Sequence, residues 1–130
     1  MSDLSQDDPA SPRLRLRILF AEDAMLGPGK AELMERIRET GSISAAGRQM
    51  RMSYKRAWML VEEMNAAFCQ PLVSSARGGQ GGGGAHLTET GDEVLRLYRA
   101  VEETAARAAE AEISTLHALL KPASDISRRK

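Results

Sequence analysis

The chain has 130 residues, and its 18 Lys and Arg side chains balance 18 Asp and Glu side chains. This length is typical of one domain with a modest core. A single cysteine excludes an intramolecular disulfide, and two histidines leave no cluster at zinc-ligand spacing. No apolar run approaches the roughly 20 residues needed to span a bilayer, and the acidic start is unlike a signal peptide. We therefore expect a cytoplasmic protein without a metal site.

Charge is distributed unevenly along the chain. From Glu89 to Glu112 there are seven acidic residues against three arginines. Between Glu39 and Glu62, by contrast, every charged residue is basic: Arg48, Arg51, Lys55 and Arg56. Such a pattern predicts that this short stretch faces an anionic partner although the net charge is zero.

The first strand and the first helix are predicted from apolar periodicity and from proline and glycine at the helix ends. Residues 1–12 have the composition of a disordered tail, and residues 14–21 alternate apolar residues with arginines, which predicts a short strand. A helix over residues 28–40 can hold Pro28 in its first turn and end at Gly41 in the left-handed conformation.

Two more helices are expected directly afterwards. Ser42 or Ser44 can cap a short helix through Met50, and Ser53 can cap a longer one through about Phe68, because a serine oxygen accepts a hydrogen bond from a free first-turn amide. Small residues in the short helix permit close approach. Two such helices with a very short turn are typical of a helix-turn-helix.

The rest of the chain predicts a hairpin and a long helix. Two strand-like pieces surround the glycine-rich run GGQGGGG, and a helix over residues 89–120 can be capped by Thr88. Its apolar positions recur at three and four residues, which predicts a dimerisation surface. They are Val94, Tyr98, Val101, Ala105, Ala109, Ile113, Leu116 and Leu120.

The order strand, three helices, hairpin and long helix predicts a winged helix-turn-helix, mainly α with a small β wing. We expect a DNA-binding domain over residues 13–88, the dimerisation helix over residues 89–120 and a polar tail over residues 121–130.

In a helix-turn-helix the second helix enters the major groove with its N-terminal residues against the base edges. Arg56 can then form a bidentate pair with guanine, and Lys55 can reach guanine or a phosphate. A solvated charged face is the competing interpretation, but the surrounding elements favour DNA. The predicted DNA contacts are Ser42, Ser44, Arg48, Ser53, Tyr54, Lys55, Arg56, Arg77, Gly79, Gln80, Gly81 and Gly82.

The glycine run formally contains a dinucleotide-binding pattern at Gly79, Gly81 and Gly84. A strand-like segment follows it instead of the helix that this motif requires. The sequence shows no Ser/His/Asp or Cys/His set for nucleophilic catalysis. It also shows no paired carboxylates beside an obvious apolar pocket. We therefore expect no enzyme, and interpret the glycines as a wing that approaches the DNA backbone.

Several segments carry a family resemblance: SISAAGRQMRMSYKRAWMLVEEMN, GGQGGGG and LTETG. They resemble the N-terminal DNA-binding domain of the ModE-type molybdate-responsive transcriptional regulators, a LysR-like winged helix. The resemblance covers about residues 14–120. It implies a homodimeric, sequence-specific regulator of genes for molybdenum transport or metabolism, which binds palindromic double-stranded DNA.

The sequence also differs from the full-length regulators of this type. Full-length regulators of this type carry a C-terminal region that binds molybdate, and the printed chain ends at Lys130. We therefore expect no cofactor. A non-specific nucleoid-associated or RNA-binding protein, using the same basic face, is the alternative function.

Overall fold

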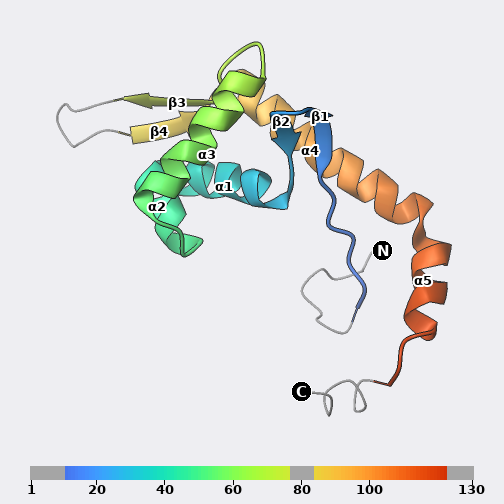
Figure 1. Cartoon of the computed structure of the whole chain (residues 1–130). Helices are drawn as coiled ribbons and strands as arrows, with labels where there is room; N and C mark the ends of the chain where they lie inside the picture. Colours follow the sequence, from blue (N-terminus) through green and yellow to red (C-terminus); the bar gives the residue numbers. More distant parts are fainter. Residues whose placement is uncertain (1–10, 77–83, 123–130) are drawn as a thin grey trace. The chain divides into compact units, whose positions relative to one another are not determined.

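The computed structural model describes residues 11–76 and 84–122. Arg15–Val101 forms one compact unit, and the helical residues from Glu102 onward belong to a second. Figure 1 shows the elements, which in chain order are β1 (Ile18–Ala21), β2 (Ala24–Leu26), α1 (Pro28–Thr40), α2 (Ile43–Gln49), α3 (Tyr54–Ala67), β3 (Val73–Ala76), β4 (Gly84–Leu87), α4 (Glu89–Ala108) and α5 (Glu110–Ala118).

Helix α1 occupies the residues that the sequence predicts for it. Pro28 lies in its first turn, and Gly41 ends it with φ 71°, a left-handed conformation that glycine adopts without steric cost. The amide of Gly41 donates to the Ile37 carbonyl at 2.8 Å. Leu33, Met34 and Ile37 are fully buried and form the centre of the core.

Helices α2 and α3 form the predicted helix-turn-helix. A Cβ on Gly47 would lie 2.9 Å from the Cβ of Ala57, so the small residues let the two helices approach closely. The turn between them is made possible by Arg51, which has φ 59°. A non-glycine residue in this region is uncommon and carries some strain.

The N-terminal strand is shorter than expected and has a partner. Residues 14–18 alternate between half-buried and exposed, but only Ile18–Ala21 forms a strand, antiparallel to β2. Strand β2 was not expected from the sequence. Leu19 and Phe20, in the apolar end of the predicted strand, are 69% and 56% exposed, so that end is not buried in the chain.

Strands β3 and β4 form the second hairpin, in which Val73 pairs with Leu87 and Ala76 with Gly84. The amide of Ala85 donates to the carbonyl of Gly41 at 2.9 Å, which attaches the hairpin to the end of α1. Together with the three helices this hairpin makes the predicted winged helix-turn-helix (Figure 1).

The helix predicted over residues 89–120 is two helices. Helix α4 ends at Ala108 and α5 begins at Glu110, although no proline or glycine separates them. Gly91, Leu95 and Tyr98 of α4 are buried, and the compact unit extends beyond residue 88 to Val101. The first part of α4 therefore belongs to the core of the DNA-binding fold.

Asn65 connects α3 to the start of β3. Its Oδ1 accepts hydrogen bonds from the amides of Leu72 at 2.8 Å and Val73 at 3.0 Å, and its Nδ2 donates to the Val73 carbonyl at 3.1 Å. Leu72 and Val73 are buried. The amide side chain therefore satisfies backbone groups that water cannot reach.

We expect Asn65→Ala to lower the free energy of unfolding by about 2 kcal/mol, because buried amides lose their acceptor. Urea denaturation of the variant measures this change. Gln70→Ala is the control, since it removes an amide side chain from an exposed position, and its expected change is below about 0.5 kcal/mol. Equal stabilities of the two variants would contradict the role assigned to Asn65.

Candidate nucleic-acid interface

The start of α2 is organised by Ser42. Its Oγ accepts a hydrogen bond from the amide of Ala45 at 3.0 Å and lies 3.4 Å from the Oγ of Ser44. Ser42 is thus the cap, and Ser44 lies within the first turn. Both are half-buried, whereas Arg48 in the last turn is exposed.

The start of α3 is capped by Ser53, whose Oγ accepts from the amide of Arg56 at 3.0 Å. The first turn contains no acidic residue. Tyr54 is 61% exposed, and its ring meets Trp58 edge-on with centroids 6.1 Å apart. Trp58 is half-buried and packs against the core.

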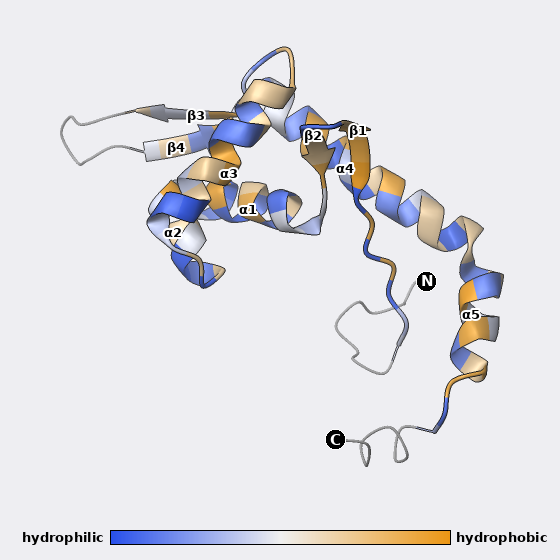
Figure 2. Cartoon of the chain, viewed as in Figure 1, coloured by the Kyte–Doolittle hydropathy of each residue, from blue (hydrophilic) through white to orange (hydrophobic). Residues whose placement is uncertain are grey.

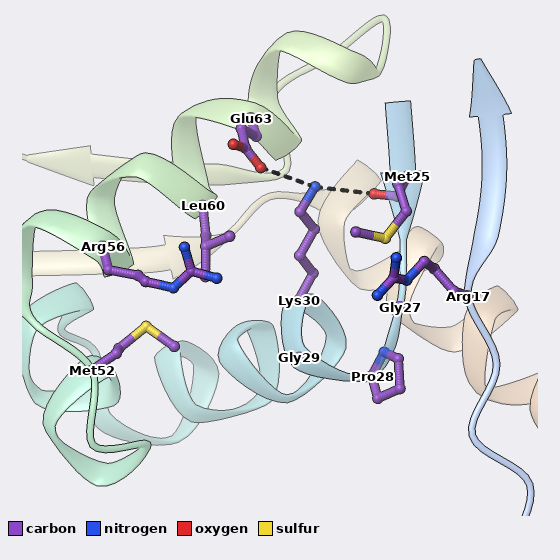
Figure 3. A pocket seen from close by; sticks show the side chains of 10 residues that line it. All are labelled: Arg17, Met25, Gly27, Pro28, Gly29, Lys30, Met52, Arg56, Leu60 and Glu63. Carbon is purple, nitrogen blue, oxygen red and sulfur yellow. Dashed lines mark hydrogen bonds and ion pairs between the residues drawn. The ribbon is translucent and has the colours of Figure 1, made fainter. Parts of the chain in front are cut away.

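The helical repeat distributes the α3 side chains over three faces. Ala57, Val61 and Met64 are buried, so Lys55 projects from the opposite, exposed face. Arg56 lies on one flank of α3 and extends toward the start of α1 (Figure 3). The two basic residues, although neighbours in the sequence, therefore point in different directions.

The cations of this surface are Arg48, Lys55 and Arg56. Within residues 11–76 and 84–122, no ion pair involves the side chains of Arg48, Lys55 or Arg56, and all three are exposed. Figure 2 shows hydrophilic residues along the end of α2 and the first turn of α3. Uncompensated charge at the exposed start of a recognition helix can attract a polyanion.

The predicted wing contacts lie outside the described residues: Arg77, Gly79, Gln80, Gly81 and Gly82. Their contribution to DNA binding stays a prediction. Ala76 ends β3 and Gly84 begins β4, so these two residues border the part of the wing that is not described.

The predicted dimerisation stripe is divided by its burial. Tyr98 is only 1% exposed, and its hydroxyl donates to the Leu16 carbonyl at 2.6 Å, so it belongs to the core of its own chain. This corrects its assignment to a dimer surface. Val101, Leu116 and Leu120 are 43%, 64% and 61% exposed, while the remaining positions are half-buried: Val94, Ala105, Ala109 and Ile113.

Lys30, which is only 7% exposed, has a role that was not predicted from the sequence. Its Nζ donates to the Met25 carbonyl at 3.1 Å and lies 3.3 Å from a carboxylate oxygen of Glu63. This ion pair joins α1 to α3 and so helps to position the candidate DNA-binding helix. A lysine after Gly-Pro-Gly gives no signal of burial, because its ion-pair partner is distant in sequence.

The described residues contain no group of three or more His, Cys, Asp and Glu side chains arranged to hold a metal ion. Among the helices of the same residues, none has the length and apolarity that a membrane crossing requires.

Comparison with known proteins finds relatives for part of the chain. No protein-family model matches the chain. It is 42% identical over 80 residues to the transcriptional regulator ModE of Yersinia pestis, covering 62% of this chain and 28% of the relative. The chain is homologous to the N-terminal region of ModE regulators. This result confirms the resemblance found in the sequence.

Two further relatives of the chain are a second ModE regulator and the protein MopB. The DNA-binding transcriptional dual regulator ModE of Escherichia coli K12 is 41% identical over 80 residues, which cover 62% of this chain and 29% of the relative. The molybdenum-pterin-binding protein MopB of Rhodobacter capsulatus is 41% identical over 90 residues, which cover 69% of this chain and 33% of MopB. The chain thus spans about a third of these relatives. Their names describe regulators and a pterin-binding protein, in agreement with the prediction that this ModE homologue is not an enzyme.

A solved structure supports the fold. The crystal structure of a CbnR_DBD-DNA complex matches with a TM-score of 0.53 at 19% identity, over 68% of this chain and 95% of the CbnR chain. It confirms a LysR-type DNA-binding domain fold for the ModE-like region.

Proposed function

We propose that the chain is a sequence-specific DNA-binding transcriptional regulator that inserts α3 into the major groove. The observation that carries this proposal is the pair of exposed cations, Lys55 and Arg56, at the start of a capped helix in a helix-turn-helix, which form no ion pair with any described residue. Homology to ModE regulators and the fold shared with the CbnR_DBD-DNA complex support it.

Each residue has a distinct role in this proposal. Lys55 projects from the exposed face of α3 toward a base edge or a phosphate, and Arg56 reaches a guanine from the flank of the helix. Ser53 and Tyr54 hydroxyls donate to phosphates or bases, while Ser42, Ser44 and Arg48 position the protein on the backbone. The wing residues contact the adjacent backbone: Arg77, Gly79, Gln80, Gly81 and Gly82.

The names of the relatives indicate which genes the proposed regulator controls. ModE proteins and a "molybdenum transport protein" are among them, so we infer that the targets serve molybdenum transport or metabolism. Such a regulator acts in the cytoplasm. We propose no cofactor for the region described by the structure.

The test is selection of bound duplexes from a random library, followed by affinity measurements at one salt concentration. A specific regulator is expected to bind the selected site at least about a thousandfold more tightly than random duplex. Similar affinities for both duplexes, or for RNA, would support the alternative of a non-specific nucleoid-associated or RNA-binding protein.

We further propose that two copies assemble through α4 and α5. The supporting observation is the exposure of Val101 on α4, of Leu116 on α5 and of Leu120 just beyond the end of α5. Figure 2 shows apolar residues along both helices. Large exposed apolar side chains indicate an interaction surface when they recur along a helix. A two-fold dimer presents α3 to half-sites about one helical turn, or a multiple, apart, so the selected site is expected to be an imperfect palindrome.

A charge in this stripe is expected to separate the copies. The wild-type chain should sediment as a dimer at micromolar concentration, and Leu116→Glu should shift it toward monomer, because a carboxylate is unfavourable in an apolar contact. Leu19→Glu is the matched control, since Leu19 is 69% exposed on β1. A monomeric wild type, or dissociation by the Leu19 change alone, would refute the assignment to α4 and α5.

A further inference from the structure

A pocket lies on the flank of α3 that faces the start of α1 and β2. Its volume is about 330 Å³. Figure 3 shows its walls: Arg56 and Leu60 extend from α3, Lys30 from α1, and Arg17 from the segment before β1. The pocket therefore contains one of the residues assigned to DNA reading.

The charges on the walls do not balance. Glu63 is the acidic group that lines the pocket, and it is already paired with the buried Lys30 at 3.3 Å. Arg17 and Arg56 are exposed and form no ion pair within the described part of the chain. Their guanidinium groups approach the space from opposite sides (Figure 3).

The two arginines are held on different elements. Arg17 follows Leu16, whose carbonyl accepts the 2.6 Å hydrogen bond from Tyr98 and so anchors that segment to the core. Arg56 lies in the first turn of α3, whose cap Ser53 fixes the backbone of the turn. The backbone at both arginines is therefore held in place by the fold.

We infer that this pocket binds a small molecule carrying a phosphate-type oxyanion between Arg17 and Arg56. Guanidinium groups bind such oxyanions through two parallel hydrogen bonds each. Met25 and Met52 on the walls supply an adaptable apolar surface for the rest of an organic anion.

A bound anion would also affect DNA binding, a consequence that rests on the proposed function. An anion in the pocket holds the Arg56 side chain turned toward α1, where it cannot reach a base. Anion and DNA then compete for the same guanidinium, and each lowers the affinity for the other. The pocket would make DNA binding sensitive to an oxyanion metabolite.

The first experiment measures anion binding by calorimetry on the full chain, with inorganic phosphate and sulfate as probes and chloride at matched ionic strength. We expect saturable binding in the millimolar range or tighter, weakened at least about tenfold by Arg17→Gln, since one charge-assisted pair is lost. Arg15→Gln, an exposed arginine outside the pocket, is the control and should bind as wild type. Absence of saturable binding, or equal loss in both variants, overturns the inference.

The second experiment measures affinity for the selected duplex at increasing phosphate and constant ionic strength. At ten times the phosphate dissociation constant, wild-type affinity should fall about tenfold by simple competition, whereas Arg17→Gln should be insensitive and bind DNA normally without phosphate. A free anion and a DNA-backbone phosphate share the same chemistry. If Arg17→Gln instead weakens binding to selected and random duplex equally, the pocket holds a backbone phosphate and the inference is refuted.

The two experiments also separate the pocket from the proposed function. Saturable, Arg17-dependent anion binding without any preferred duplex would support the anion pocket and contradict the proposed function as a sequence-specific regulator. A preferred duplex without anion binding would do the reverse.

Discussion

Gly91→Ala is expected to lower the free energy of unfolding by about 3 kcal/mol or more. A Cβ at this position would lie 2.1 Å from the carbonyl oxygen of Leu72 and 3.0 Å from its carbonyl carbon. That carbonyl belongs to the backbone of a fully buried residue, and it accepts the amide of Thr88 at 2.9 Å. It cannot move without losing this hydrogen bond, so the overpacking cost lies at the upper end of the usual range.

Thermal and urea denaturation measure the effect, which corresponds to a fall in melting temperature of more than about 10 °C for a domain of this size. Gly29→Ala is the matched control, because a Cβ there meets no atom within 4 Å. In the helical α1 it should be neutral or stabilising by up to about 1 kcal/mol. If both variants melt with the wild type, the close contact between α4 and the start of the wing is absent.

Arg56→Ala is expected to weaken binding to the selected duplex by about 1 to 3 kcal/mol and to relax the preference at one base position. The reason is the loss of a bidentate pair from the first turn of α3. Binding to random duplex should change less, because base contacts carry specificity and phosphate contacts do not. Fluorescence titrations with duplexes varied at each position provide the measurement.

Arg96→Ala removes the same charge from an exposed residue of α4 that is already paired with Glu93 at 2.7 Å. Its affinity for both duplexes should stay within about twofold of the wild type, as surface ion pairs contribute little. If Arg56→Ala weakens selected and random duplex to the same degree, Arg56 contacts a phosphate rather than a base. Buffers for these titrations should contain neither phosphate nor sulfate, given the pocket that Arg56 lines.

The sequence alone determined the features that depend on near neighbours in the chain. Pro28 and Gly41 bound α1, Ser53 caps α3, and the winged helix-turn-helix follows from the order of the elements. The sequence left the cap of α2 open between Ser42 and Ser44, and the structure shows Ser42 in that role. Each signal acts through one or two turns of backbone, so both partners stand close together in the sequence. The same holds for the basic residues at the start of α3, whose lack of nearby acids is visible in the chain itself.

The tertiary structure decided everything that depends on residues far apart. The residues near Lys30 in the sequence do not indicate its ion pair with Glu63. Those near Asn65 do not indicate its hydrogen bonds with the amides of Leu72 and Val73. Gly91 is required only because the backbone of Leu72 lies against it. Tyr98 fits the periodicity of a dimer stripe, yet its partner is the Leu16 carbonyl, 82 positions away in the chain. Periodicity identifies which side of a helix is apolar, but whether its own chain or another covers that side is settled only by packing.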